Sequence, residues 1–305
     1  MVGVGACPIC GVQNLRKLRS FVIRDGDALP SGPLADYYAL RRRVLFEVWE
    51  APREGFQLRV LVCRACGFVC YSPRPSESDL ENKYRFLQVH EVNIGGTTSP
   101  ETDDVRARQM FDRIRPHAGE AKRVLDCGGG TGKLMKPWLE SSHEVFLVDY
   151  SETPIAGVTR LGNTLQDLEP GAQFDLAISA HVLEHLVNPV QHLRDISKVL
   201  VPGGLIYAEV PFELEPYMDR VGDDPVTHLN YFSPASFLRM AEEAGIRVVE
   251  YWMGTSTYSG WSIRFLAFVG KPDIHHLPKT EGGYQATRHH LTPSLRQRVK
   301  RLLGR

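Results

Sequence analysis

The middle of the chain alternates short apolar runs with longer segments in which apolar positions recur every three or four residues. Short apolar runs predict buried strands, whereas the spaced pattern is typical of amphipathic helices. Strands that alternate with helices favour the α/β class, with a mostly parallel seven-stranded sheet and helices on both faces. We expect strands at 123–126, 145–149, 163–168, 174–179, 205–211, 247–251 and 264–269.

Helices are expected between these strands. One is predicted over 103–117, where it would cover the ligand site, and another over about 132–141. A third begins near Pro189. Ser233 and Pro234 predict the start of a further helix, because serine is a favoured N-cap residue and proline is favoured at the first helical position.

Four cysteines form two Cys-x-x-Cys pairs, CPICG at 7–11 and CRACG at 63–67. Each pair places two thiolates on a tight turn, and two such turns complete the tetrahedral S4 site of a zinc ribbon. Buried reduced thiols are the alternative, and a redox pair is disfavoured because neither pair opens a helix after a strand. The expected zinc ligands are Cys7, Cys10, Cys63 and Cys66.

The wide separation of the two pairs predicts an insertion over about 20–57, which includes a helical stretch at 35–49. Cys70 and Cys127 fall outside the two-residue spacing and receive no role as ligands. Four thiolates leave no open position for a substrate, so the expected zinc is structural. Its binding energy would hold together a module that is too small to fold on its own core.

The segment VLDCGGGTG at 124–132 joins a strand to a glycine-rich turn, in the pattern Asp126-x-Gly128-x-Gly130-x-Gly132. Glycines permit a sharp bend and remove the side chains that would keep a ligand at a distance. The carboxylate at the strand end suits a cation or a set of hydroxyl groups, and it repels phosphate. A Walker-type loop is excluded because no Ser or Thr follows Lys133.

A second acid, Asp149, ends the second expected strand. NAD-binding Rossmann domains place an acid in a similar position, so this residue alone does not decide between cofactors. The glycine bend with its two acids resembles motif I of class I methyltransferases that use S-adenosylmethionine (SAM). Two later elements also resemble signatures of that family, namely VLEH at 182–185 with its following Asn188-Pro189, and VPGG at 201–204.

The resemblance implies that SAM is the cofactor and assigns roles around it. Asp149 would hold the ribose hydroxyls, and Asp167 would meet the adenine amino group. The cofactor-binding residues that the resemblance implies are Asp126, Gly128, Gly130, Gly132, Asp149, Asp167, Ala180 and His181.

The cysteine pairs, the Pro-x-Pro turn after them and the helix that follows are similar to a bacterial group of small-molecule and sugar methyltransferases that includes deoxysugar C-methyltransferases. In this family the seventh strand runs antiparallel at the edge of the sheet. The resemblance implies a zinc-binding module with an insertion (1–75), junction helices that cover the active site (76–120), a SAM-dependent methyltransferase domain (121–272), and a linker with a basic C-terminal helix (273–305).

Methyl transfer requires alignment of the reacting atoms and often the removal of a proton, for which histidine is the natural base near neutral pH. His228 lies in THLNYFS, which resembles the HxxYFS element of the sugar C-methyltransferases, where a glutamate-histidine pair is proposed to act. Thr227 takes the place of that glutamate, so we expect O-methylation rather than C-methylation. His185 is the second candidate base. The residues expected to line the substrate cavity are Tyr84, Phe86 and Tyr231.

Composition narrows the choice of partners. The 305 residues carry 36 basic and 36 acidic side chains, so no net charge attracts nucleic acid. No apolar run approaches the ~20 residues that span a bilayer. The first residues lack the charged region of a signal peptide, and we expect a cytoplasmic protein. The expected function is SAM-dependent methyl transfer to a small-molecule, sugar or glycan acceptor.

Two other functions stay open. An rRNA or other nucleic-acid methyltransferase with a zinc module could use the basic residues at 41–43, and a non-catalytic scaffold would only bind SAM or a partner. The last residues, 294–305, predict a short basic helix that is either solvated or in contact with an anionic partner or membrane surface. Specificity for the acceptor is assigned to 76–120, to 213–224 and to the loop between strands six and seven.

Overall fold

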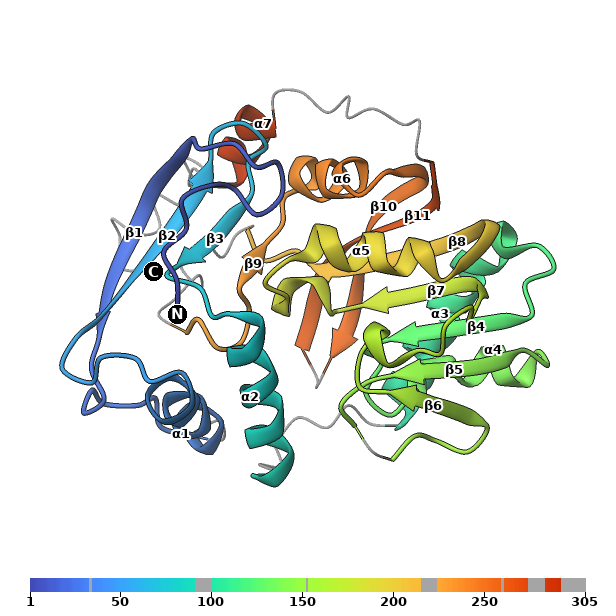
Figure 1. The fold of residues 1–305 in the computed structure, drawn as a ribbon, viewed down its shortest axis with the longest axis horizontal. Coiled ribbons are helices and arrows are strands. Elements are labelled where there is room, and N and C mark those ends of the chain that lie inside the picture. Colours follow the sequence, from blue (N-terminus) through green and yellow to red (C-terminus); the bar gives the residue numbers. More distant parts are fainter. Residues whose placement is uncertain are drawn as a thin grey trace.

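The computed structural model describes residues 1–32, 35–90, 100–151, 153–214, 224–258, 261–273 and 283–291. Two β-sheets lie side by side, with helix α2 (Glu77–Val89) between them (Figure 1). The larger sheet has seven strands and the smaller has four. The smaller sheet belongs to the N-terminal module. The larger sheet forms the core of the domain that contains the glycine bend.

The larger sheet confirms the α/β class. Its strands follow the order β10-β11-β8-β7-β4-β5-β6. Strands β4 to β8 run parallel to one another, whereas β11 is antiparallel to both β8 and β10. The strands are β4 (Arg123–Cys127), β5 (Glu144–Val148), β6 (Val158–Gly162), β7 (Phe174–Ala180), β8 (Leu200–Pro211), β10 (Ile246–Tyr258) and β11 (Trp261–Pro272).

Two expectations for this sheet are wrong. The third strand is β6, and the segment 163–168 instead contains a 3-10 turn, Leu165–Asp167. Thr164 and Asp167 form a capping box that closes this turn, which explains why a strand does not continue there. The seventh strand, β11, is not at the edge, because β10 folds back beside it and takes that place.

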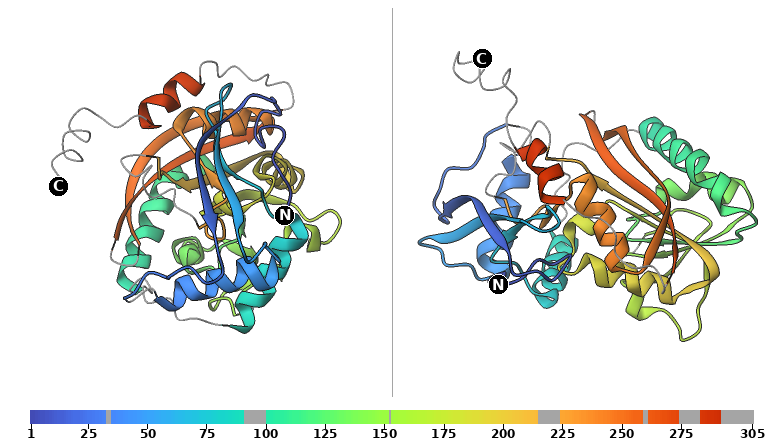
Figure 2. Two further views of the ribbon diagram at one scale, coloured as in Figure 1. Left: turned by 90° about the vertical axis from the view of Figure 1, so that its left-hand side faces the viewer. Right: turned by 90° about the horizontal axis from the view of Figure 1, so that it is seen from above.

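Helices cover both faces of the larger sheet, as the sequence predicts (Figure 2). Helices α3 (Pro100–Ala118) and α4 (Lys136–Glu140) share one apolar cluster on one face, in which the rings of Phe111 and Trp138 lie 4.7 Å apart. The helix expected over 132–141 begins as a 3-10 turn, Lys133–Met135, before α4. The other face is covered by α5 (Pro189–Lys198) and α6 (Pro234–Glu243), which begins at the capping serine, Ser233.

The smaller sheet is antiparallel, in the order β1-β2-β3-β9. Its first three strands are β1 (Leu15–Ile23), β2 (Phe56–Cys63) and β3 (Val69–Ser72), and its fourth is β9 (Asn230–Tyr231). The expected insertion therefore consists of strand ends around α1 (Ala35–Arg43) and a π-helical turn, Val44–Val48. Since β9 lies far downstream in the chain, the module at 1–75 does not complete its sheet alone.

Helices α2 and α7 join the two sheets. Helix α2 begins at Ser76, whose hydroxyl and backbone amide both bond with Asp79. Helix α7 (Gly283–Leu291) lies within the segment expected to be a linker, and that part of the prediction is wrong. It packs on the second cysteine turn so closely that a Cβ on Gly67 would lie 2.0 Å from Thr287 Oγ1. The basic helix expected at 294–305 lies outside the described residues.

None of the described helices is both long enough and apolar enough to cross a membrane.

Candidate active site

The glycine bend follows the carboxyl end of β4 and adopts backbone angles that favour glycine. Gly128, Gly130 and Gly132 have φ angles of 82°, 61° and 75°, which side-chain-bearing residues rarely adopt. The amide of Gly128 donates to the carbonyl of Val148, at the end of β5, over 2.8 Å. The bend is thus held against the neighbouring strand, at the edge of the sheet where open α/β domains bind ligands.

Asp149 fixes the bend from β5. Its Oδ2 accepts from the amide of Gly130 over 2.9 Å, and its Oδ1 accepts from the amide of Ser151 over 2.7 Å. Each carboxylate oxygen accepts more than one hydrogen bond. The side chain therefore supports the loop and still has lone pairs to offer to a pair of hydroxyl groups.

Asp126 lies in β4, just before the bend, and one of its carboxylate oxygens has no hydrogen bond in the described residues. The residue is 2% exposed, and its Oδ2 has no hydrogen-bond partner in the described part of the chain. A Cβ on Gly129 would lie 1.7 Å from that oxygen, so this position must remain glycine. Burial, together with the negative charge of Asp149, raises the pKa of Asp126 to about 7. Such a carboxyl fits a cationic or hydrogen-bond-donating ligand, because either would offset its burial.

The other implied cofactor residues surround this bend less closely. Asp167 uses Oδ2 to accept from the amides of Asn163 and Thr164, so it stabilises its own turn. Ala180 ends β7, and the next residue, His181, has a φ angle of 58°. The role of Asp167 beside an adenine ring stays a prediction.

His181 is held between two buried acids. Its Nε2 lies 2.9 Å from Glu209 Oε1, and its Nδ1 lies 3.4 Å from Glu184 Oε1. Burial by itself would lower the pKa of His181, but the two carboxylates raise it to about 9. Arg106 and Tyr207 also donate to Glu209, and the pKa of this acid falls to about 2 despite its burial. His181 is therefore a cation at neutral pH.

The two candidate bases lie together. The rings of His185 and His228 have centroids 4.8 Å apart, although the two residues come from different loops. His185 ends a 3-10 turn, Leu183–His185, that follows β7. His185 Nδ1 donates to the carbonyl of Thr227 over 2.6 Å, so the backbone beside His228 orients His185.

Glu213 is the functional residue that the sequence did not reveal. Its Oε2 lies 2.8 Å from Nδ1 of His228, so a carboxylate orients this imidazole after all. Thr227 therefore does not leave His228 without a carboxylate partner, and the expectation of O-methylation loses the ground on which it was based. Glu213 lies two residues beyond β8, at the same carboxyl edge as the bend. The position of Glu213 just after a strand was the signal that could have identified it. The sequence analysis assigned the region 213–224 to specificity but named no partner for His228 there.

The two histidines differ in how readily each gains a proton, because their pKa values shift in opposite directions. Burial, with the nearby charges of His228 and Lys83, holds the pKa of His185 well below its usual value. Burial also acts to lower the pKa of His228, but the Glu213 carboxylate outweighs it and raises that pKa. His185 is thus neutral, and His228 gains a proton more readily than an ordinary histidine does.

Residues of the N-terminal half support the loop that carries His228. Lys83 Nζ, which is buried, donates to the carbonyl of Val226 over 2.8 Å. Burial and the charge of Arg41 lower the pKa of Lys83 to about 7. Arg41 Nε lies 3.1 Å from Asp224 Oδ2, at the start of the same loop. The position of the candidate base therefore depends on α1 and α2.

Arg74 supports the same region from the end of β3. Its guanidinium is 5% exposed and donates to the carbonyls of Leu186, Val187 and Leu229 over 3.0–3.3 Å. Leu186 and Val187 directly follow the turn that contains His185, and Leu229 directly precedes β9. One buried cation thus joins both histidine loops to the N-terminal sheet.

The two aromatic residues expected to line the cavity from α2 have different surroundings. Tyr84 stacks on Tyr150, the residue after Asp149, with ring centroids 4.9 Å apart. Phe86 instead stacks on His90 and lies under Arg43. Positions two apart on a helix point in nearly opposite directions. The role of Phe86 in lining a substrate cavity stays a prediction.

The contacts of Tyr231 are with the N-terminal sheet and with His228. It belongs to β9, and its hydroxyl donates to Tyr71 Oη over 3.2 Å. Its ring lies 6.5 Å from that of His228, so it packs beside the candidate base. Contact between Tyr231 and an acceptor stays a prediction.

The four cysteines of the two pairs converge at one point. Cys7 and Cys66 have sulfurs 3.6 Å apart, as do Cys10 and Cys63, and all four are free thiols. A tetrahedral zinc ion with Zn–S bonds of ~2.3 Å separates its sulfurs by roughly 3.8 Å. The four sulfurs therefore have the spacing and the donor type that a zinc ion requires. These four cysteines form no disulfide bonds with one another.

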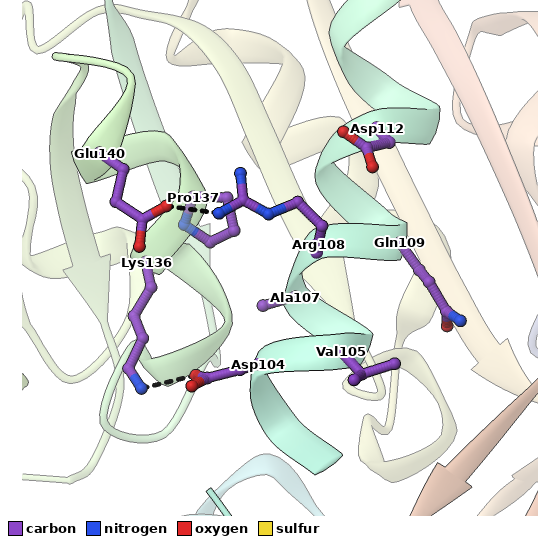
Figure 3. A pocket seen from close by; sticks show the side chains of 9 residues that line it. All are labelled: Asp104, Val105, Ala107, Arg108, Gln109, Asp112, Lys136, Pro137 and Glu140. Atoms are coloured by element: carbon purple, nitrogen blue, oxygen red, sulfur yellow. Dashed lines mark hydrogen bonds and ion pairs between the residues drawn. The ribbon is translucent and has the colours of Figure 1, made fainter. Parts of the chain in front are cut away.

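A surface hollow of about 430 Å³ lies elsewhere, between α3 and α4 (Figure 3). Two ion pairs, Lys136–Asp104 and Arg108–Glu140, cross it. Its lining includes no residue of the glycine bend and neither histidine. We therefore assign the chemistry to the carboxyl edge of the sheet and not to this hollow.

Comparison with known proteins agrees with this assignment. Residues 101–251 match the family model described as a methyltransferase domain. A solved structure from Burkholderia thailandensis, 1,6-didemethyltoxoflavin-N1-methyltransferase with bound S-adenosylhomocysteine, has a TM-score of 0.53 at 19% identity and covers 68% of this chain and 96% of its own. The chain thus contains a class I SAM-dependent methyltransferase domain.

Curated relatives match the same domain. A ubiquinone biosynthesis O-methyltransferase from Ruegeria pomeroyi is 34% identical over 140 residues, which cover 40% of this chain and 53% of the relative. A tRNA 5-carboxymethoxyuridine methyltransferase from Escherichia coli is 32% identical over 130 residues, which cover 37% and 50%. The chain spans about half the length of these relatives, and they act on different kinds of acceptor.

Proposed function

We propose that this protein transfers the methyl group of SAM to an oxygen of a small-molecule, sugar or glycan acceptor, with His228 as the general base. The observation that carries the proposal is the pairing of His228 with Glu213 beside the loop after β7, at the same sheet edge as the glycine bend. A partly buried histidine-carboxylate pair at that edge is a typical arrangement for proton removal.

The bend and its acids fit SAM better than a phosphate-bearing cofactor. Asp126 offers a buried free oxygen to the cationic amino-acid end of the cofactor, and Asp149 offers lone pairs to the ribose hydroxyls. Asp167, Ala180 and His181 would surround the adenine end. When bound, SAM supplies an electrophilic methyl group on a sulfonium sulfur.

The chain's own contribution is to hold the acceptor in line and to accept its proton. When His228 is neutral, Nδ1–H donates to Glu213, and Nε2 keeps the lone pair that takes the proton. Glu213 then stabilises the imidazolium that forms. Neutral His185 would accept a hydrogen bond from the acceptor at Nε2, because its Nδ1–H is already used on Thr227.

Several observations favour a small acceptor over nucleic acid. The chain has no net charge, and two of the arginines at 41–43 are paired internally, Arg41 with Asp224 and Arg43 with Glu47. The relative from Ruegeria pomeroyi is named for O-methylation in ubiquinone biosynthesis, which supports oxygen as the nucleophile. The Escherichia coli relative is named for tRNA, so RNA is the competing acceptor.

We also propose that Cys7, Cys10, Cys63 and Cys66 hold a structural zinc ion. The measured sulfur spacing supports this, and so does the packing of α7 on the second cysteine turn. Four thiolates complete the coordination of zinc, so this metal would have no part in the methyl transfer.

Isothermal titration calorimetry with SAM and turnover assays with candidate acceptors test the function. We expect SAM binding by the wild-type protein and by His228→Ala, with turnover only in the wild type. Absence of SAM binding would remove the proposal. Binding of SAM without turnover of any hydroxyl-bearing acceptor, or RNA binding that falls steeply with added salt, would favour a scaffold or an RNA enzyme respectively.

A further inference from the structure

We propose that Glu184, His185 and His228 form a binding site for a divalent cation, separate from the four cysteines. One carboxylate oxygen and one nitrogen from each ring lie within 4.8 Å of one another. We call these three residues the Glu-His-His cluster. Glu184 and His185 follow β7, and His228 lies in the segment before β9, so only the folded chain brings the donors together.

Glu184 supplies the first argument. The side chain is completely buried, and neither of its oxygens has a hydrogen-bond partner in the described ranges of the chain. Nδ1 of the cationic His181 lies 3.4 Å from Oε1, and Nε2 of the neutral His185 lies 3.8 Å from it, so both contacts are longer than an ordinary hydrogen bond. His181 gives this buried carboxylate one long ion-pair contact, and neither oxygen has a hydrogen bond in the described residues. A cation shared with His185 and His228 would compensate the remaining burial.

The hydrogen bonds of the two histidines supply the second argument. His185 uses Nδ1 on the carbonyl of Thr227, and His228 uses Nδ1 on Glu213 Oε2. In both rings, Nε2 is then the nitrogen with an available lone pair. Histidines that bind metals almost always donate their other N–H to a carbonyl or carboxylate in this way, because that contact fixes the tautomer and the ring direction.

The donor set indicates the class of ion. Two neutral imidazoles and one carboxylate suit first-row divalent cations such as Mn²⁺, Fe²⁺, Co²⁺ or Zn²⁺, and they suit Mg²⁺ or Ca²⁺ less well. Three protein ligands leave coordination positions open, unlike the four cysteines. An acceptor oxygen could occupy such a position.

The consequence for catalysis rests on the proposed methyl transfer from SAM but replaces His228 as the group that promotes loss of the acceptor's proton, whereas cation binding itself does not rest on that function. A cation in the cluster would occupy the lone pair that His228 needs as a base. It would instead lower the pKa of a coordinated acceptor hydroxyl, whose proton would pass to water before the methyl group is transferred. The C–S bond of SAM then breaks as the new C–O bond forms, and no oxidant or reductant is required.

Titration with Mn²⁺, followed by electron paramagnetic resonance of the free ion, tests the site. The protein is first loaded with one equivalent of zinc per chain, which the four thiolates take up in preference to the Glu-His-His cluster, so that the cysteines do not compete for Mn²⁺. We expect about one additional Mn²⁺ per chain, and binding weakened at least roughly 10- to 100-fold in both Glu184→Gln and His228→Gln. The matched control is His143→Gln, since His143 bonds to the carbonyl of Trp138 and lies outside the cluster.

No Mn²⁺ bound at millimolar concentration, or equal binding by Glu184→Gln and the wild type, would overturn the proposal. If Glu184→Gln fails to fold, as judged by its thermal unfolding, His228→Gln alone decides. Calorimetry with SAM on the same samples separates the two proposals. Mn²⁺ binding without SAM binding would leave the cation site standing and remove the proposed function, and the reverse result would remove only the cation site.

Discussion

The cysteine cluster and the Glu-His-His cluster bring donor atoms together by different routes. Each cysteine pair comes from one tight turn, with Gly11 or Gly67 donating its backbone amide to the carbonyl of the pair's first cysteine. The histidines and Glu213 come from three separate segments that meet only at the end of the large sheet. A local cluster can be read from spacing, whereas a cluster of distant segments depends on the whole fold.

The two clusters are nevertheless mechanically connected. Strand β3, which follows the second cysteine pair, pairs with β9 immediately after His228. Arg74 and Lys83 bond to backbone carbonyls on either side of that strand and of the histidine turn. The N-terminal module therefore supports the segment that carries His228, and we expect that loss of the cysteine cluster would disturb the position of His228.

The largest effect is expected from breaking the cysteine cluster. Cys63→Ser should abolish zinc binding and unfold the module, because structural zinc in small domains contributes roughly 10–16 kcal/mol of apparent binding energy. Zinc content by mass spectrometry and circular dichroism measure this. Cys70→Ala is the control, since Cys70 is buried in β3 but is not a ligand, and it should keep its zinc. Full zinc content in Cys63→Ser would contradict the assignment.

A large effect on turnover is expected from His228→Ala. Loss of a general base typically reduces turnover by about 10²–10⁴, while SAM affinity should be unchanged. Steady-state kinetics with calorimetry measures both quantities. His117→Ala is a suitable control, because His117 pairs with Glu250 on the far side of the large sheet. Turnover close to that of the wild type would leave His228 with a structural role only.

A smaller and more specific effect is expected from Glu213→Gln. Removal of a partner that orients a functional histidine costs roughly 10- to 100-fold. His228 accepts a proton from the acceptor only when it is neutral, so turnover falls as the pH drops through its pKa. The Glu213 carboxylate raises that pKa, and its loss should move the acidic limb of the pH profile to lower pH. An unmoved limb would show that Glu213 does not act through His228.

The smallest effect is expected at the cofactor site. Asp149→Ala should weaken SAM binding by about 1–3 kcal/mol, the usual result of leaving polar groups without partners. Asp167→Ala is the informative comparison, because Asp167 is occupied with its own turn. Calorimetry with SAM ranks the two, and equal affinity of Asp149→Ala and the wild type would argue against ribose binding.

Much of the fold could be predicted from the sequence, because it depends on patterns of residues that are close together in the chain. The apolar runs located six of the seven strands, and the glycine spacing located the bend, whose three positive φ angles match the prediction. The third strand was misplaced because Thr164 and Asp167 close a turn, and a capping box overrides a weak apolar pattern.

The amino-acid sequence by itself determined the class of domain, the two cysteine turns and the acids at the ends of β4 and β5, since each depends on residues close together in the chain. Only the tertiary structure decided that Glu213 pairs with His228, that β9 completes the N-terminal sheet and that α7 packs on a cysteine turn. These contacts join segments whose separation along the chain carries no periodic signal. They form because the sheet brings the ends of its parallel strands to one edge, and that convergence exists only once the chain has folded.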